Sequence, residues 1–585
     1  MTLTPIDWVV IALYFVASAV VGVIYSRRAS KSSEEFFLSG RTIPWWLAGT
    51  SMVATTFAAD TPLAVTGLTV KYGIAGNWLW WSFVMSGILT VVFYARLWRR
   101  AGVMTDAEFA EIRYSGKPAA FLRGFRACYL ALAVNSIIIG WVTSAMAKII
   151  GMTLGVGKVE ATVGLFVLTG LYSALSGLWG VLVTDFFQFI LAMLGCIALA
   201  VFAINAVGGM GALLTAVHTK FPDREVLQLV PSLDSAWMPA ITFFVYVAVN
   251  WWASWYPGAE PGGGGYVAQR IMSTKNERHA LLAALWFNIA HYALRPWPWI
   301  LVALVSMIQY PGLADPESGY VKVMVDVLPP FWRGFMLAAF FAAYMSTIST
   351  QLNWGASYLV NDVYRRFWVP GRLESHYANI GRVATLLMMV ISGIVTMYIG
   401  TVEGAWKFLL AIGAGTGLVY LLRWYWWRVN AWSEVSAMAA ALVISLAAQR
   451  AGLNQDDPRG FAWLLLITTV GTTIVWLVVT YLTAPEPAER LKAFYARVRP
   501  GGPGWTAVVP AAGEERLGNG LLQWALGCLV VYAGLFGIGD LVLGRPGRGG
   551  ISIVIAAVVV TYIVRATRVG EPMTRAQEGP RRVVS

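Results

Sequence analysis

The sequence predicts an all-α protein that crosses a membrane many times. Hydrophobic residues make up 58% of its 585 residues, charged residues only 12%, and the mean hydropathy is +0.64. Soluble domains carry about twice that share of charged residues. The 28 Trp suit a chain with two extended membrane–water interfaces. We therefore expect a polytopic membrane protein embedded in a lipid bilayer.

Fifteen apolar runs are long enough to cross a bilayer. In chain order they cover residues 5–25, 43–71, 77–98, 125–153, 158–178, 181–207, 237–257, 281–308, 331–362, 381–400, 404–424, 432–450, 461–483, 520–543 and 550–566. Between the fifth and sixth runs the segment SALSGLWG offers only a tight turn. Two long polar segments interrupt the series: 208–235, expected to be an external loop, and 484–519, expected to be an internal linker with a short amphipathic helix at 487–498 lying on the membrane surface.

The basic residues give the expected orientation. The net charge is +13, but Lys and Arg cluster in short segments between apolar runs, which is the topogenic pattern and not a nucleic-acid-binding stripe. With fifteen crossings the basic loops fall on one side, so the N-terminus is predicted outside and the C-terminus in the cytoplasm, in the plasma (inner) membrane. No signal-peptide cleavage pattern precedes the first run, so we expect it in the mature protein.

Cysteine and histidine give no sign of an enzyme. Cys128, Cys196 and Cys528 lie far apart within apolar runs, and the four His are scattered. This spacing gives neither a disulfide framework nor a metal site, and no Ser–His–Asp arrangement lies at one membrane depth. We expect no catalytic residues and no organic cofactor.

Two of the predicted helices are interrupted at matching positions. The second contains VATTFAADTPLAVTG (Val53–Gly67), and the seventh runs into NWWASWYPGAEPGGGGYVAQR (Asn250–Arg270). Pro removes a helical hydrogen bond and Gly weakens a helix, so both segments should unwind near the middle of the bilayer. The second and seventh runs are five positions apart in the series, as two five-helix units of inverted topology require. Broken helices at corresponding positions of inverted repeats indicate the central site of a secondary transporter.

One predicted helix carries a stripe of oxygen atoms. At helical spacing Ala343, Ser346, Thr347 and Thr350 share one face, with Ser349 on its flank. Lipid offers these hydroxyls no hydrogen bonds. They either form hydrogen bonds with neighbouring helices or together bind a small hard cation.

Three segments resemble the sodium:solute symporter family: LYSALSGLWGVLVTDFFQF (Leu171–Phe189), YVAQRIMSTKNERHA (Tyr266–Ala280) and AAYMSTISTQLNWGASYLVNDVY (Ala342–Tyr364). The resemblance covers roughly residues 5–480. It implies a LeuT-type fold of two inverted five-helix repeats with one extra N-terminal helix and about four extra C-terminal helices. The implied divisions are 1–40 (extra helix and cytoplasmic loop), 41–207 (first repeat), 208–235 (extracellular loop), 236–428 (second repeat), 429–483 (two helices), 484–519 (cytoplasmic linker) and 520–585 (two helices and a basic tail).

The same resemblance implies sodium as the coupling ion. Carried over by position, the main sodium site falls on the carbonyls of Ala54, Phe57 and Ala343 and the hydroxyls of Ser346 and Thr347. Some members of the family bind a second sodium ion, and the matching residues here are Asp185, Ser346, Ser349 and Thr350. Asp185 lies near the predicted cytoplasmic end of its span, so a helix cap or a place on the sodium exit route stays open as an alternative.

A substrate should lie at the middle of both broken helices. The candidates for substrate binding or gating are Thr55, Thr56, Asp60, Thr61, Trp255, Tyr256, Glu260 and Arg295. Our hypothesis is that Asp60 or Glu260 pairs with Arg295 or contacts a cationic or polyhydroxylated solute; a buried structural ion pair is the alternative.

The implied function is sodium-coupled symport of a small polar organic solute into the cytoplasm by alternating access. Sugars, amino acids, vitamins and carboxylates all occur as substrates in the family, and the residues do not choose among them or indicate an oligomeric state. A proton-coupled transporter on the same fold and a transporter-like solute sensor with a separate partner are the alternatives.

Overall fold

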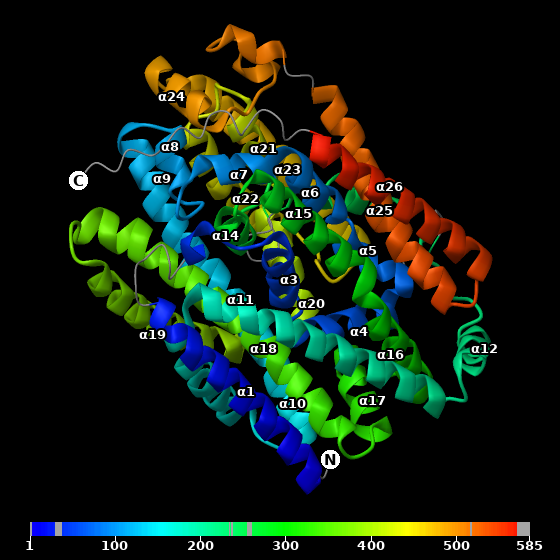
Figure 1. The fold of residues 1–585 in the computed structure, drawn as a ribbon. Helices are drawn as coiled ribbons and strands as arrows, with labels where there is room; N and C mark the ends of the chain where they lie inside the picture. Colours follow the sequence, from blue (N-terminus) through cyan, green and yellow to red (C-terminus); the bar gives the residue numbers. More distant parts are fainter. Residues whose placement is uncertain are drawn as a thin grey trace.

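The computed structural model describes residues 3–29, 38–232, 235, 238–253, 260–514 and 517–569. These residues form helices joined by turns, with one bridge pairing Ile43 and Thr274. Figure 1 shows α3 (Trp45–Thr56) at the centre of the molecule. It is surrounded by α11 (Lys158–Ala206), α14 (Gly265–Ser273), α15 (Glu277–Asn288) and α18 (Trp332–Ser357).

The remaining helices complete the two halves of the chain. In the first half they are α1 (Pro5–Ala29), α4 (Asp60–Tyr72), α5 (Trp78–Trp81), α6 (Val84–Leu89), α7 (Ala95–Ala101), α8 (Phe109–Arg113), α9 (Gly116–Cys128), α10 (Asn135–Leu154) and α12 (Met210–Lys220). In the second half they are α13 (Ala240–Ala248), α16 (Pro296–Gln309), α17 (Gly319–Val327), α19 (Glu374–Tyr398), α20 (Val402–Gly413), α21 (Gly417–Tyr425), α22 (Ala431–Arg450), α23 (Pro458–Leu482), α24 (Ala488–Val498), α25 (Leu517–Val542) and α26 (Pro546–Val569).

Short 3-10 and π segments lie between or within these helices. The 3-10 turns are η1 (Ser39–Arg41), η2 (Ile74–Asn77), η5 (Asn250–Trp252), η7 (Pro316–Ser318), η9 (Pro503–Trp505) and η10 (Pro510–Glu514). The π segments are η3 (Thr90–Tyr94), η4 (Tyr129–Val134), η6 (Ile289–Leu294) and η8 (Tyr358–Trp368). Such π segments are often found at functional sites.

Many of the expected spans are recovered as membrane-length helices. Within the described ranges nine helices are long and apolar enough to cross a bilayer, or ten if the bent pair α20–α21 counts as one span. The polytopic all-helical class is therefore confirmed, whereas the count of fifteen is not.

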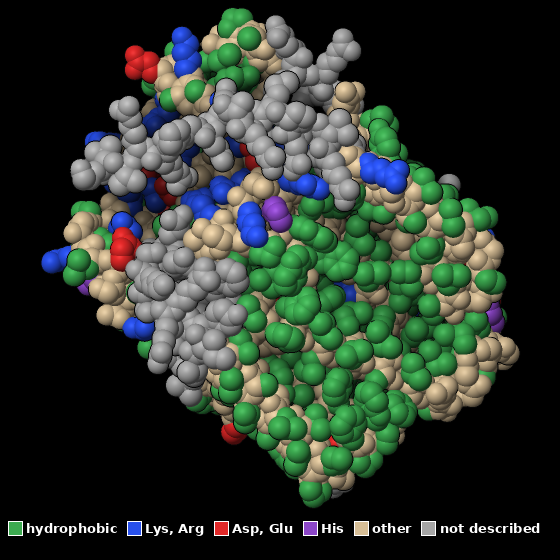
Figure 2. Space-filling view, in the orientation of Figure 1, with side chains coloured by type: hydrophobic (Ala, Val, Ile, Leu, Met, Phe, Trp, Pro, Cys, Tyr) green, Lys and Arg blue, Asp and Glu red, His purple; other side chains and the backbone are tan. Residues whose placement is uncertain are grey.

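Figure 2 shows apolar side chains covering a broad face of the molecule. Lys and Arg gather beyond one edge of this face, at the end where α7, α8 and α9 lie, which we call the basic end.

The break predicted in the second run is present. Helix α3 ends at Thr56, the Phe57 N–H bonds back to Val53 O and Ala54 O at 2.9 and 3.1 Å, and α4 starts at Asp60. Pro62 lies in the first turn of α4, where its missing N–H leaves no helical acceptor unpaired. The chain thus reverts from helix to irregular backbone in the middle of a buried segment.

The break predicted in the seventh run is present as well. Helix α13 ends at Ala248 and is followed by η5, and among the described residues the next helix begins at Gly265. Gly262 and Gly263 adopt positive φ values of 85° and 84°, and a Cβ on either would lie 3.0 Å from an atom of Tyr94 or Thr90. The glycine run therefore supplies both the backbone geometry and the close approach that this break requires.

Three local predictions are wrong or incomplete. No turn separates 158–178 from 181–207: the backbone stays helical through SALSGLWG in the 49-residue helix α11, because this segment contains no Pro to interrupt the hydrogen-bond ladder. The segment 208–235 contains the helix α12. The amphipathic helix at 487–498 is confirmed as α24, but its apolar face packs on protein, with Leu491, Phe494 and Val498 buried.

The last two helices form an antiparallel pair on the outside of the molecule (Figure 1). Helix α25 packs on α6 and η6, and three hydrogen bonds fasten it to its neighbours. Trp524 Nε1 donates to Met85 O at 2.8 Å, Tyr532 Oη donates to Trp81 O at 3.0 Å, and Trp297 Nε1 donates to Leu535 O at 3.0 Å.

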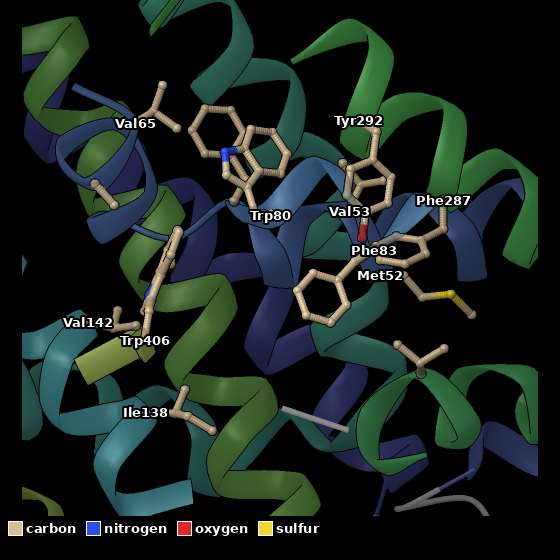
Figure 3. Packing of buried hydrophobic residues seen from close by; sticks show 14 of the residues in the cluster. Met52, Val53, Val65, Trp80, Phe83, Ile138, Val142, Phe287, Tyr292 and Trp406 are labelled. Carbon is tan, nitrogen blue, oxygen red and sulfur yellow. The ribbon is translucent and has the colours of Figure 1, made fainter. Parts of the chain in front are cut away.

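A core of buried aromatic and aliphatic side chains surrounds the two breaks. Figure 3 shows part of it, with Val53 of α3, Phe83 and Phe287 on one side and Trp80 and Trp406 on the other. Trp80 stacks on Tyr292 with ring centroids 5.8 Å apart. This packing fixes the positions of α3, α5 and η6 around the candidate site.

Candidate functional site

The oxygen stripe of α18 faces the break at the end of α3. Ser346 Oγ donates to Ala54 O at 3.1 Å and lies 3.0 Å from Ala343 O. Thr347 Oγ1 donates to Thr55 O at 2.8 Å and lies 3.1 Å from Ala343 O. All five residues are buried. Two hydroxyls and three carbonyls from two helices therefore converge, and we call this set the oxygen cluster.

The oxygen cluster has the composition that a hard monovalent cation prefers. Carbonyl and hydroxyl oxygens are hard ligands, and the set contains no nitrogen or sulfur. The regular hydrogen-bond ladder of α3 stops at the break, so the Ala54 and Thr55 carbonyls can accept from α18, although Ala54 O also accepts from the Phe57 N–H. Four of the five residues predicted for the main site are thus brought together.

Phe57, the fifth residue predicted for the main site, is placed differently. Its carbonyl is not among the acceptors of Ser346 or Thr347 in the described structure, and Thr55 O takes that place. The Phe57 ring packs edge-on against Trp299 with centroids 4.8 Å apart.

The residues predicted for a second cation lie around a guanidinium group. Asp185 Oδ2 accepts from Ser51 Oγ at 2.5 Å and lies 3.9 Å from Arg270 Nη2. The same Nη2 donates to Thr350 Oγ1 at 2.8 Å, and Thr350 Oγ1 lies 3.3 Å from Thr55 Oγ1. Arg270 and Asp185 are both fully buried. Arg270 therefore bridges the carboxylate and the hydroxyl that were expected to share a sodium ion.

Ser349 does not join this group. Its hydroxyl donates to Ser346 O at 3.3 Å, within its own helix. The alternative of a hydroxyl bonding back to its own helix therefore describes Ser349, while Ser346 and Thr347 reach both their own helix and α3.

Arg295 lies beside the α3 break and contacts two residues that were not predicted as its partners. Its Nη1 donates to Thr56 Oγ1 at 3.0 Å, and its Nη2 lies 3.2 Å from His291 Nε2. His291 Nδ1 lies 2.8 Å from Thr56 Oγ1. Because the guanidinium can only donate, His291 Nε2 accepts and Nδ1 carries the proton. Thr56 thus joins Arg295 and His291 into one hydrogen-bonded group.

Asp60 is near enough to Arg295 for an electrostatic interaction, and the pairing of these two residues stays a prediction. Asp60 is fully buried at the start of α4, beside the Trp406 side chain. Thr61 Oγ1 donates to Thr56 O at 3.2 Å across the break. Glu260 lies at a different place, in a network of charges described next.

Five buried side chains form an ion cluster near the basic end: Asp106, Arg126, Glu260, Arg423 and Glu434. Glu260 Oε1 pairs closely with Arg126 Nη2, and Glu260 Oε2 lies 3.6 Å from Arg423 Nη2. Arg126 also lies 3.5 Å from Asp106 and 3.6 Å from Glu434, and Arg423 lies 3.2 Å from Glu434. Glu260 therefore follows the alternative of a buried structural ion pair, and the cluster joins the second break to α9, α21 and α22.

A second charge group lies at the opposite end. Lys148 Nζ lies 2.8 Å from Asp315 Oδ2 and 3.1 Å from Glu317 Oε2. Glu317 Oε1 accepts from the backbone N–H groups of Val402 and Glu403 at 3.0 and 3.1 Å. A carboxylate is favourable at this helix N-terminus, so Glu317 ties α10 to α20.

Between the two ends the central space is small. A cavity of about 30 Å3 is lined by residues of α3, α6, η3, α14, α15 and η6, including Thr56, Ser86, Glu260, Asn288 and His291. That is room for about two water molecules. Trp255 and Tyr256, two of the predicted gating residues, lie outside the described residues.

Sequence reasoning missed several charged residues that the structure brings to the site. Arg126 was interpreted only as a topogenic charge and Arg423 only as part of an apolar run. Each lies at the end of a predicted span, where a buried charge needs a partner. Arg270 is the Arg of the QR string in YVAQRIM, and no role was predicted for it. His291 lies one helical turn before Arg295 in HYALRPW, and this i, i+4 spacing alone could have predicted that the two side chains are neighbours.

Comparison with known proteins identifies the family and the fold. The sequence matches the family described as "Sodium:solute symporter family" over residues 36–443. It is 23% identical to a sodium/glucose cotransporter of Vibrio parahaemolyticus over 80% of this chain and 89% of that one. It is 24% identical to sodium/glucose cotransporter 4 of Danio rerio over 84% and 80%, and 22% identical to sodium/myo-inositol cotransporter 2 of Sus scrofa over 83% and 78%.

A solved structure shares the fold. The substrate-bound, outward-open state of a Na+-coupled sialic acid symporter superposes with a TM-score of 0.67 at 19% sequence identity, covering 83% of this chain and 99% of that one. The LeuT-type fold predicted from the sequence is thereby confirmed. The family match covers well over half of the chain, and the protein belongs to the sodium:solute symporter family.

Proposed function

We propose that the protein is a sodium-coupled symporter that carries a small polar organic solute into the cytoplasm by alternating access. The observation that carries the proposal is the oxygen cluster: Ser346 and Thr347 of α18 meet the carbonyls of Ala54 and Thr55 at the unwound end of α3. Sodium binds there with Ala343 O as a further ligand, and Phe57 O completes the set when the break rearranges. The family and the named relatives support sodium as the coupled ion.

The closed ends of the molecule support alternating access. The ion cluster around Glu260 closes the basic end, and the Lys148–Glu317 group closes the opposite end. In the proposed cycle the Glu317 end opens to the outside, and sodium and solute bind beside the two breaks. That end then closes, and the basic end opens to the cytoplasm. This direction follows from assigning the basic end to the cytoplasmic side.

The proposal uses a single sodium ion, since Asp185 already faces the Arg270 guanidinium and Ser51. Moving one charge inward through the membrane potential releases about 2.3 kcal/mol per 100 mV. Thr55, Thr56 and Thr61 at the first break, with Asp60 beside them, are the groups assigned to the solute. Hydroxyl and carboxylate groups of this kind suit a solute rich in hydrogen-bond donors.

The test is sodium-dependent thermal stabilisation of the purified protein. Sodium at 100 times its dissociation constant should stabilise the folded state by about 2.7 kcal/mol, and potassium should not. The variant Ser346→Ala/Thr347→Ala should lose this effect. A matched control is Ser357→Ala/Thr385→Ala, which removes two buried hydroxyls that donate within their own helices.

The outcomes separate the alternatives. A sodium-specific shift that survives in Ser346→Ala/Thr347→Ala contradicts the assignment of the site. No sodium effect in the unmodified protein contradicts sodium coupling itself. The proton-coupled alternative is favoured by one observation, the Asp60 carboxylate that is fully buried beside the first break. Uptake that persists in sodium-free buffer and is lost in Asp60→Asn would support that alternative.

A further inference from the structure

The cytoplasmic linker predicted at 484–519 is packed on the basic end as a structured element. We call its described residues 484–514 the strap. Its apolar side chains Leu491, Phe494, Val498 and Trp505 are each at most 2% exposed, although the segment lies between two spans and is rich in Pro, Gly and charge. A linker that only connected the spans would not bury four large side chains.

One side of the strap contacts the segment that follows α7. Arg113 of α8 places its guanidinium 5.3 Å from the Phe494 ring centroid and 5.1 Å from that of Trp505. Arg100, at the end of α7, donates from Nη1 to Arg499 O at 3.2 Å. Arginine over aromatic faces is stabilising, the more so when it is desolvated. The strap is thus fixed to α7 and α8.

The other side of the strap contacts α21. Trp505 Nε1 donates to Trp424 O at 2.8 Å, and the Trp427 N–H donates to Gly504 O at 3.1 Å. The backbone approach is so close that a Cβ on Gly504 would lie 2.0 Å from Tyr425 O. Figure 1 shows α24 beside α8, above α21.

The strap is linked to the ion cluster through Arg113 and Phe109, which contact both. Arg113 Nε donates to Arg423 O at 2.8 Å, and the Arg423 guanidinium lies 4.6 Å from the ring centroid of Phe109, which itself packs edge-on against Phe494. Arg423 is one of the two partners of Glu260. Opening of the basic end separates Glu260 from these arginines, and the strap covers the residues that must move.

From these contacts we propose that the strap is a brake on the candidate transport site: it holds the basic end closed by joining α7 and α8 to α21, and its release sets how often that end opens. This inference rests on the proposed function, since it assigns a regulatory role within alternating access. Trp505 is its central residue, because it stacks on Arg113 and donates to α21.

The test measures access to the central cavity from the basic end. A single cysteine at Ser86→Cys, which lines the cavity, is placed in a chain whose three native cysteines are changed to serine. Labelling by a membrane-impermeant maleimide is timed in everted and right-side-out membrane vesicles, in sodium and in potassium. Trp505→Ala should raise the labelling rate from the strap side about tenfold, the change that 1.4 kcal/mol produces, and leave the rate from the other side unchanged.

The controls keep the outcome decisive. Trp332→Ala removes a half-buried tryptophan from the start of α18, outside the strap and the ion cluster, and should not change either rate. If Trp505→Ala does not fold, Trp505→Phe keeps the stacking on Arg113 but loses the indole hydrogen bond, and it should raise the rate by a smaller factor. Equal labelling of Trp505→Ala, Trp505→Phe and the unmodified strap overturns the inference.

A failure of the proposed sodium-coupled function would give a different result from a failure of the brake. If sodium changes neither the melting temperature nor the labelling rate of the protein with an unmodified strap, then the sodium-coupled function is wrong. If sodium changes both and the strap variants behave like the unmodified protein, then the function stands and the brake does not exist.

Discussion

Glu260 provides the most demanding test of the buried ion cluster, because it contacts both arginines of the cluster. Three carboxylates, from Asp106, Glu260 and Glu434, face the two guanidinium groups of Arg126 and Arg423. All five side chains are at most 4% exposed in these contacts. Glu260→Gln removes one negative charge that both arginines share.

The expected loss is large because the arginines stay buried. Removing one partner of a buried ion pair costs about 3–5 kcal/mol. Here Asp106 and Glu434 remain near Arg126, at 3.5 and 3.6 Å, so we expect a loss of about 3 kcal/mol, at the lower end of that range. Arg126→Met alone should cost a similar amount, since it leaves the Glu260 carboxylate with Arg423 only.

The assay is a double-mutant cycle on the free energy of unfolding in a mild detergent. Glu260→Gln, Arg126→Met and the double variant are compared with the unmodified protein. Residues in one network show coupling of about 0.5–3 kcal/mol, and the close contact between these two predicts a value above about 1.5 kcal/mol. Additive losses would refute the view that Glu260 and Arg126 depend on each other.

Three other predictions follow from particular contacts. Asp185→Asn should destabilise the protein by about 3 kcal/mol, because Arg270 loses its buried carboxylate, while leaving the sodium-induced thermal shift unchanged; a weakened shift would restore Asp185 as a sodium ligand. Gly87→Ala should lower the melting temperature, because its Cβ would lie 1.8 Å from Asn288 Oδ1; an unchanged melting temperature would contradict the packing. Burial opposes ionisation of Glu111 in α8, but hydrogen bonds from two neighbouring arginines hold its pKa below 4.5. A lowered carboxyl pKa stabilises the folded state above the unfolded pKa and loses this effect as pH falls through the folded value, so Glu111→Gln should flatten the acid side of a stability–pH curve below about pH 4.5.

Features that depend on a single segment of the chain could be predicted from the sequence. The positions of both breaks follow from Pro62 and from the glycines at 262–265, which act on their own backbone. The oxygen stripe follows from helical spacing within α18, which puts Ser346 and Thr347 on one face whatever helix packs against it. Local chemistry determines such features.

Features that depend on distant segments could not be predicted in this way. The partners of Glu260 come from α9 and α21, and the partner of Asp185 comes from α14, so no spacing rule connects them. The sequence pattern identifies Arg295 as a further charge deep in a span, but it does not show which groups surround it. The turn expected at SALSGLWG failed for a related reason: small residues permit a turn, but they do not interrupt a helix as Pro does.

The attachment of α25 has a consequence for how this chain could be recombined with its relatives. Each of its three joints pairs an indole or phenol donor with a main-chain carbonyl: Trp524 with Met85, Tyr532 with Trp81, and Trp297 with Leu535. A main-chain acceptor is present whatever side chain occupies that position. For these three hydrogen bonds, therefore, only the donor positions need to be kept when the terminal hairpin is grafted onto another symporter, and the side chains at the accepting positions can change.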